Sequence, residues 1–140
     1  MASVLHGAPL HTYDVDLVYS KTDQNIERLL LFLADIEAIF RIQPHRKLQP
    51  NESHLRGNGH LNLLTRYGYL DLLAILEEGI DYEYLIARSS PLDIGEDLTI
   101  QVIPLELVIE LKERVGGDKD RAVLPLLRAT LAESRKKSAD

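Results

Sequence analysis

The sequence predicts an α/β (α+β) protein in which helices flank a mixed β-sheet. Three observations indicate this class: short stretches rich in β-branched and aromatic residues, longer stretches with apolar residues at helical spacing, and paired apolar runs joined by short turns. Because strand and helix patterns alternate and hairpins are also present, a mixed sheet is favoured over an all-parallel, doubly wound sheet.

The first strand is expected at Tyr13 to Tyr19, which reads Tyr-Asp-Val-Asp-Leu-Val-Tyr. Thr22 is suited to cap the helix that follows, and apolar residues then recur at helical spacing from Ile26 to Phe40. Residues 41–59 contain proline, glycine and asparagine and predict a long polar connection. Such connections in compact domains are often functional or mobile.

Two hairpins are expected in the second half of the chain. Leu61–Arg66 and Tyr69–Leu76 are apolar runs separated by a Tyr-Gly dipeptide. Leu92–Ile94 and Leu98–Ile103 flank a Gly-Glu-Asp turn. Each pair is therefore expected to form two antiparallel strands.

Helices are expected around and after these hairpins. Asp81 is suited to cap a short helix that ends near Ala87. Pro104 fits the first position of a helix that runs to Val115, where two glycines would end it.

The last helical stretch is expected from Lys119 to about Arg135, with Asp118 as its N-terminal cap. Pro125 lies inside this stretch. Because proline cannot donate a backbone hydrogen bond, we expect a kink or a break there.

Composition limits the possible functions. A chain of 140 residues can bury one core, so a single domain over residues 1–140 is expected. The net charge of -6 gives no general footprint for nucleic acid, and a chain without cysteine has neither disulfides nor thiolate metal sites. No apolar run approaches the roughly 20 residues of a membrane span, and no signal-peptide pattern opens the chain, so we expect a cytoplasmic protein.

Asp14 and Asp16 are the first candidate site residues. Side chains two apart in a strand project from the same face, so the two carboxylates would lie side by side. Val15 and Leu17 would then face the core. Neighbouring carboxylates repel each other unless a cation lies between them, and Mg²⁺ prefers oxygen ligands of this kind. The alternative is an Asp-x-Asp pair at an exposed strand edge with no chemical role.

Asp71 is the third candidate because it lies within the apolar run Leu-Asp-Leu-Leu-Ala-Ile-Leu. An unpaired charge in an apolar strand is costly, so it needs a partner or a role. If its strand lies beside the first one, Asp71 can complete a cluster of three carboxylates. Such clusters hold metal ions for phosphoryl or nucleotidyl transfer. Alternatively, Asp71 lies at a strand end or pairs with Arg66.

Several short motifs follow one another along nearly the whole chain. They are His6-Gly-Ala-Pro, Thr12, Asp14-Val-Asp-Leu-Val, Leu61-Asn-Leu-Leu-Thr-Arg, Tyr69-Leu-Asp-Leu-Leu, Leu107-Val-Ile-Glu-Leu-Lys and Gly117-Asp-Lys-Asp. This ordered set resembles the small stand-alone nucleotidyltransferase-like proteins of bacteria, relatives of polymerase-β-like enzymes, aminoglycoside nucleotidyltransferases and some toxins of toxin-antitoxin pairs.

The resemblance implies a nucleotidyltransferase-type fold and transfer of a nucleoside monophosphate from a nucleoside triphosphate to a hydroxyl acceptor. Asp14 and Asp16 would be the first metal-binding and catalytic pair, and Asp71 the third acid. The ion would be Mg²⁺ or Mn²⁺. Lys112 and Lys119 match basic positions near the end of the domain. Each of the two lysines either contacts phosphate or is a solvated helix residue.

The sequence departs from the family pattern at its beginning. Relatives carry a Gly-Gly or Gly-Ser turn ten or more residues before the Asp pair, where backbone N–H groups approach the triphosphate. Gly7 is too close to Asp14 to be this turn, and Leu10 stands where relatives often carry arginine. Either the first strand and the turn lie upstream of the assigned start, or this member has lost part of its nucleotide site.

Two other functions compete with the transferase. One is a non-catalytic member of the same fold that acts in a toxin-antitoxin or other protein complex, or as a homo-oligomer. The other is a phosphoesterase that uses the same acids, because metal ions and carboxylates serve both reactions. His11 lies near the Asp pair in sequence, where it either touches substrate or is an ordinary loop histidine.

Overall fold

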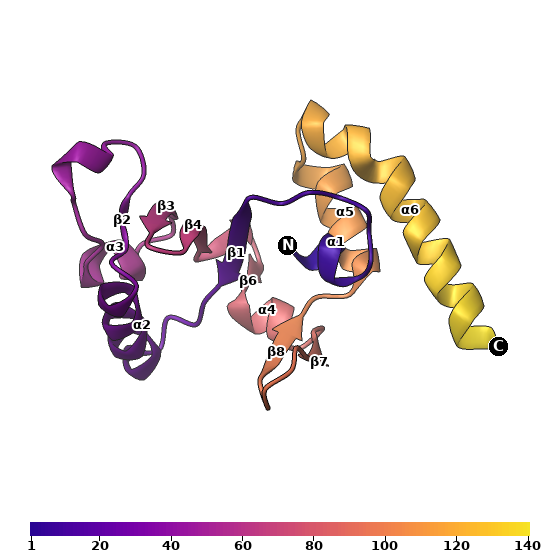
Figure 1. Ribbon diagram of the computed structural model, residues 1–140, viewed down its shortest axis with the longest axis horizontal. Helices are drawn as coiled ribbons and strands as arrows, with labels where there is room; N and C mark the ends of the chain where they lie inside the picture. The colour runs from indigo at the N-terminus through magenta and orange to yellow at the C-terminus, as the bar shows by residue number, and fades with distance from the viewer. The chain divides into compact units, whose positions relative to one another are not determined.

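The computed structural model describes all 140 residues, Met1–Asp140, and confirms a mixed α/β architecture of the α+β kind (Figure 1). The chain forms two compact units. We call Thr12–Tyr84 the sheet unit, and Met1–His11 together with Leu85–Asp140 the helical unit. That residues 1–140 behave as one domain stays a prediction.

The sheet unit is built on a four-stranded mixed sheet with the strand order β1-β4-β3-β2. Its strands are β1 (Asp14–Val18), β2 (Ile39–Phe40), β3 (His60–Thr65) and β4 (Gly68–Leu73). β1 is parallel to β4, whereas β3 is antiparallel to both β4 and β2. The first strand and the first hairpin are therefore confirmed, and β1 lies at one edge of the sheet.

The helix after β1 begins where the sequence predicts and ends earlier. In α2 (Asp23–Asp35), the Thr22 hydroxyl accepts a hydrogen bond from the backbone N–H of Asn25 at 3.3 Å. The expectation that this helix continues to Phe40 was wrong. Glu37 has a left-handed φ of 56°, which ends the helical path, and Phe40 lies in β2.

The long connection at residues 41–59 is more ordered than the sequence predicts. It contains a 3-10 turn, η1 (Pro44–Arg46), and a short helix, α3 (Glu52–Arg56). The Asn51 side chain accepts from the backbone N–H of His54 at 3.1 Å, and His54 Nδ1 accepts from the backbone N–H of Asn51 at 3.0 Å. Histidine here takes the place of the usual Glu or Gln in a capping box, so the pattern is easily missed.

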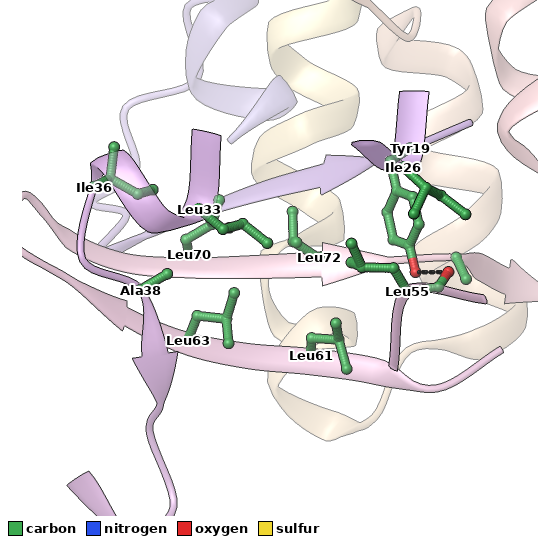
Figure 2. Packing of buried hydrophobic residues seen from close by; sticks show 11 residues of the cluster. Tyr19, Ile26, Leu33, Ile36, Ala38, Leu55, Leu61, Leu63, Leu70 and Leu72 are labelled. Carbon is green, nitrogen blue, oxygen red and sulfur yellow. Dashed lines mark hydrogen bonds between the residues drawn. The ribbon is translucent and has the colours of Figure 1, made fainter. Parts of the chain in front are cut away.

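The apolar core of the sheet unit lies between one face of the sheet and the helices α2 and α3. Leu61 and Leu63 of β3 and Leu70 and Leu72 of β4 point to the same side of the sheet (Figure 2). The residues packed with them include Tyr19, Ile26, Leu33, Ile36, Ala38 and Leu55. The residues between these leucines therefore project from the opposite face.

Tyr19, directly after β1, joins this core to α3. Its hydroxyl donates a hydrogen bond to the backbone C=O of Leu55 at 2.8 Å (Figure 2). Burial raises the pKa of the Tyr19 phenol above its ordinary value of 10.0. The folded protein therefore favours the neutral phenol. The raised pKa therefore contributes stability to the folded protein below the unfolded-state pKa of Tyr19. This contribution is lost as the pH rises through the higher folded-state pKa.

We expect Tyr19→Phe to lower the free energy of unfolding near pH 7 by about 1–2 kcal/mol, because it leaves the Leu55 carbonyl without its donor. Above pH 10 the difference should shrink, because the variant has no buried phenol to ionise. Urea unfolding of both proteins at pH 7, 9 and 10.5 measures this. A difference that is constant over this range would contradict the account.

Two short strands and a helix follow the sheet. β5 (Ile75–Glu77) pairs with β6 (Ile80–Asp81) in an antiparallel ribbon. The helix α4 (Tyr82–Ile86) begins where Asp81 Oδ1 accepts from the backbone N–H of Tyr84 at 3.0 Å. The predicted cap and helix are therefore confirmed.

The helical unit contains the second predicted hairpin and two packed helices. Its elements are α1 (Ala2–Leu5), β7 (Ser90–Asp93), β8 (Thr99–Val102), α5 (Leu105–Val115) and α6 (Asp118–Ala139). β7 and β8 form an antiparallel pair. Apolar residues of α5 and α6 meet in a second core, which contains Ala8, Leu105, Val108, Ile109, Leu124 and Leu127.

The ends of α5 and α6 differ in detail from the prediction. Pro104 is the N-cap of α5 and not its first residue. The cap of α6 is Gly117, and Asp118 is the first helical residue. α6 also continues unbroken through Pro125, although a proline inside a helix costs about 3 kcal/mol. Burial of the apolar residues on either side of the proline, Leu124 and Leu127, offsets this cost.

Candidate functional site

The three predicted acids lie on one face of the sheet. In the parallel pair of β1 and β4, Asp16 is directly opposite Asp71. Because Leu70 and Leu72 point into the core, Asp71 and Asp16 project from the other face. Asp14 precedes Asp16 by two residues and projects from the same face. We call this surface, opposite the core, the acid face.

A row of polar residues crosses the acid face from strand to strand. Arg41 directly follows β2, and its backbone N–H donates to the C=O of Asn62 in β3 at 3.0 Å. Asn62 is opposite Asp71 in β4, and Asp71 is opposite Asp16 in β1. Residues that are distant in sequence thus come together because four strands place them at the same level of the sheet.

Arg41 and Asn62 are the partners of the partly buried Asp71 carboxylate. Asp71 Oδ1 accepts a hydrogen bond from Asn62 Nδ2 at 2.9 Å and from Arg41 Nη2 at 3.2 Å. Arg41 Nη1 also lies 3.6 Å from Asp14 Oδ2, which makes an ion pair. The Asp71 side chain is only 14% exposed, so its contact with a cation offsets a real desolvation cost.

Two arginines of the sheet unit lie over tyrosine rings. The Arg41 guanidinium lies 5.0 Å from the centre of the Tyr69 ring, within cation–π range. Tyr69 is opposite Asp14 in the sheet. Arg66, the partner suggested for Asp71 by the sequence, instead lies over the Tyr67 ring at 4.9 Å.

Val15 and Leu17 do not enter the core as the sequence predicts. They face the core side of the sheet, opposite Leu70 and Leu72, yet they are 39% and 40% exposed. β1 is the last strand of its sheet, so apolar neighbours reach these side chains from one side only.

The donor chemistry of the acid face fits a hard divalent cation. Mg²⁺ prefers oxygen ligands and is often held by one or two carboxylates together with water and substrate phosphates. Asp16 and Asp71 offer such a pair on neighbouring strands. No group of three His, Cys, Asp or Glu side chains is arranged to hold a metal ion, and Arg41 contacts two of the acids. These side chains alone therefore do not form a complete metal site, and an ion at this face would need further oxygen ligands.

The two predicted phosphate-binding lysines belong to the helical unit. Lys112 of α5 is partly buried, and its Nζ lies 2.5 Å from Asp120 Oδ1. Lys119 is exposed in the first turn of α6. This contact gives the Lys112 ammonium a counter-charge within the helical unit, whereas phosphate binding by either lysine stays a prediction.

A hollow of about 400 Å³ lies in the helical unit between α6 and the start of α5. Its charged groups are already paired, because Arg135 Nη2 lies 3.3 Å from Glu106 Oε1. His6 Nε2 lies 2.8 Å from the carbonyl of Ile103. These polar groups already have partners within the helical unit, so the acid face remains the better candidate site.

Sequence reasoning missed Arg41 and Asn62 as site residues. Two features of the sequence could have pointed to polar partners for Asp71. A carboxylate in an apolar strand requires a cation or donors, and Asn62 is likewise a polar residue between two leucines in the neighbouring strand. Arg41 gave no comparable signal, because it belongs to a basic stretch within a predicted loop.

No protein-family model, curated protein or solved structure matches this chain. None of its helices is long and apolar enough to cross a membrane.

Proposed function

We propose that this protein is a metal-dependent nucleotidyltransferase that transfers a nucleoside monophosphate from a nucleoside triphosphate to a hydroxyl acceptor. The observation that carries the proposal is the register of β1 and β4, which puts Asp16 opposite Asp71 and leaves Asp14 on the same face. Carboxylates on adjacent strands are suited to an ion that also binds phosphate oxygens. The ordered motifs that resemble small nucleotidyltransferases support the same chemistry.

The residues of the acid face would have distinct roles in this reaction. Asp16 and Asp71 would hold Mg²⁺ or Mn²⁺, and Asp14 would add a third acid beside them. Asn62 donates to Asp71 and thereby fixes the orientation of that carboxylate. When bound, the ion neutralises phosphate charge and activates the attacking oxygen.

The test is a calorimetric titration of the full chain with each of four nucleoside triphosphates, with and without Mg²⁺ or Mn²⁺. We expect nucleotide binding that requires the ion, and release of pyrophosphate once a hydroxyl acceptor is supplied. Release of inorganic phosphate or nucleotide hydrolysis without transfer would favour a phosphoesterase instead. A folded chain that binds neither ion nor nucleotide would refute the proposal.

A second candidate is a non-catalytic protein of the same fold that pairs with a partner or with itself. The observation that favours it is the position of β1 at the sheet edge, where Val15 and Leu17 are exposed. Edge strands with apolar side chains readily pair with another chain. Light scattering on the titrated sample distinguishes the candidates, because stable self-association without nucleotide binding would favour the second.

A further inference from the structure

We propose that Asn58 is a site of spontaneous covalent modification: the backbone nitrogen of Gly59 attacks the Asn58 side-chain amide, and Lys21 assists the attack. The product is aspartate or isoaspartate at position 58. Three observations carry the proposal: the Asn-Gly sequence, its exposed position between α3 and β3, and the hydrogen bond from Lys21 Nζ to Asn58 Oδ1. The proposal does not depend on the proposed function.

The backbone around this dipeptide leaves the attacking nitrogen open. Residues 57–59 lie outside the helices and strands, in the short connection from α3 to β3. No hydrogen bond within the chain engages the Gly59 N–H. A Cβ built on Gly59 would meet no atom within 4 Å, so neighbouring side chains do not cover this residue. Because glycine has no side chain of its own, its nitrogen can approach Asn58 Cγ closely.

Lys21 lies at the oxygen of the amide that is attacked. Its Nζ donates to Asn58 Oδ1 and also to the backbone C=O of Arg56, the latter at 3.2 Å. When the Gly59 nitrogen adds to Cγ, negative charge develops on Oδ1. A cationic donor at that oxygen stabilises the charge in the same way as a donor of an oxyanion hole. The contact with the Arg56 carbonyl keeps the ammonium in this place.

The reaction requires water and no other reagent. The bond between the Gly59 nitrogen and Asn58 Cγ forms, and the bond between Cγ and Nδ2 breaks. Ammonia leaves with the proton that the Gly59 nitrogen loses, and a cyclic imide remains. Water opens the imide at Cγ to give aspartate, or at the main-chain carbonyl to give isoaspartate. Both products carry a new carboxylate, and Lys21 supplies its counter-charge.

The other three asparagines of the chain are internal controls. Asn25 lies in α2, Asn62 lies in β3, and the Asn51 side chain caps α3. The residue that follows each of them is an isoleucine, a leucine or a glutamate, and its side chain crowds the backbone nitrogen. The N–H of Ile26, which follows Asn25, also donates to the C=O of Thr22 at 3.0 Å. These three asparagines should therefore persist while Asn58 is converted.

The experiment is a timed incubation of the full chain at pH 8, followed by proteolytic digestion and mass spectrometry. Conversion of an asparagine raises the mass of its peptide by about one dalton, and chromatography separates the aspartate and isoaspartate forms. We expect Asn58 to convert at least about tenfold faster than any other asparagine, because only its successor lacks a side chain. Gly59→Ala should slow this conversion by about tenfold, and the open space at Gly59 lets the variant fold.

Lys21→Gln tests the assistance by the ammonium. It should slow the conversion of Asn58 by about three- to tenfold, less than the loss of a donor in an enclosed site, because Lys21 is partly exposed. Lys21→Arg keeps a cationic donor and should fall between wild type and Lys21→Gln. Lys47→Gln is the matched control: it removes the same charge from an exposed lysine of the same unit and should change the rate by less than about twofold. Circular dichroism checks that each variant is folded.

The rates decide both parts of the proposal. If Asn58 converts no faster than the other three asparagines, the modification site is wrong. If Asn58 converts and Lys21→Gln leaves its rate unchanged or raises it, Lys21 does not assist the attack. Slower conversion in Gly59→Ala and Lys21→Gln, with no change in Lys47→Gln, would support the proposal. Metal ions and nucleotides are absent from these measurements, so the proposed function is tested separately.

Discussion

Replacing Leu72 with alanine should lower the free energy of unfolding by about 2–5 kcal/mol, the range for a leucine lost from a close-packed core. Leu72 is fully buried, at 0% exposure, and lies in β4 between two neighbouring strands. The truncation removes apolar burial and also leaves a cavity that the sheet cannot easily close. Guanidinium-induced unfolding of the full chain, with its slope compared with that of wild type, measures the loss.

Leu17→Ala is the control for this prediction. Leu17 is opposite Leu72 in the parallel register and faces the same side of the sheet, but it is 40% exposed at the edge. Its truncation should cost less than about 1 kcal/mol, because little buried volume is lost. Equal losses in the two variants would mean that β1 is packed as deeply as β4, contrary to the structure.

In the proposed transferase, Asp16→Asn should lower metal-dependent nucleotide transfer by at least about a hundredfold, because the variant would lose a charged ligand of the proposed metal site and with it several kcal/mol of transition-state stabilisation. Asparagine has nearly the same shape as aspartate, and Asp16 lies at the exposed edge strand, so the fold should persist. Asp71→Asn should also lower transfer. It additionally weakens the contacts with Arg41 and Asn62, so Asp16 is the sharper test.

Asp35→Asn is the charge-matched control for the Asp16 variant. Asp35 is an exposed carboxylate at the end of α2, away from the acid face. Transfer and Mn²⁺ affinity should be unchanged in this variant. If Asp16→Asn were as active as Asp35→Asn, the carboxylate of Asp16 would have no role in catalysis, and the metal site would have to be abandoned.

Local patterns were sufficient to predict most elements of the fold. Thr22 and Asp81 cap their helices because a side-chain oxygen can reach an N–H three residues ahead without help from the rest of the chain. The two hairpins also follow from short turns between apolar runs. Such signals act over a few residues, so sequence alone reveals them.

The predictions failed where distant contacts overruled a local preference. Phe40 continues a helical spacing but lies in a strand, because pairing with β3 decides its conformation. A break at Pro125 was one of the two expected outcomes, yet α6 continues through this residue, and Leu124 and Leu127 near it are buried in the second core. Leu17 matches a core position by alternation and is exposed because its strand lies at an edge.

The sequence by itself determined that Asp14 and Asp16 share a face, because side chains alternate along any strand. Only the tertiary structure decided that Asp71 faces Asp16 and that Arg41 lies between Asp14 and Asp71. The physical reason is that strands take the order in a sheet that buries their apolar faces in one common core. That process places residues from separate parts of the chain side by side, and no spacing along the sequence records it.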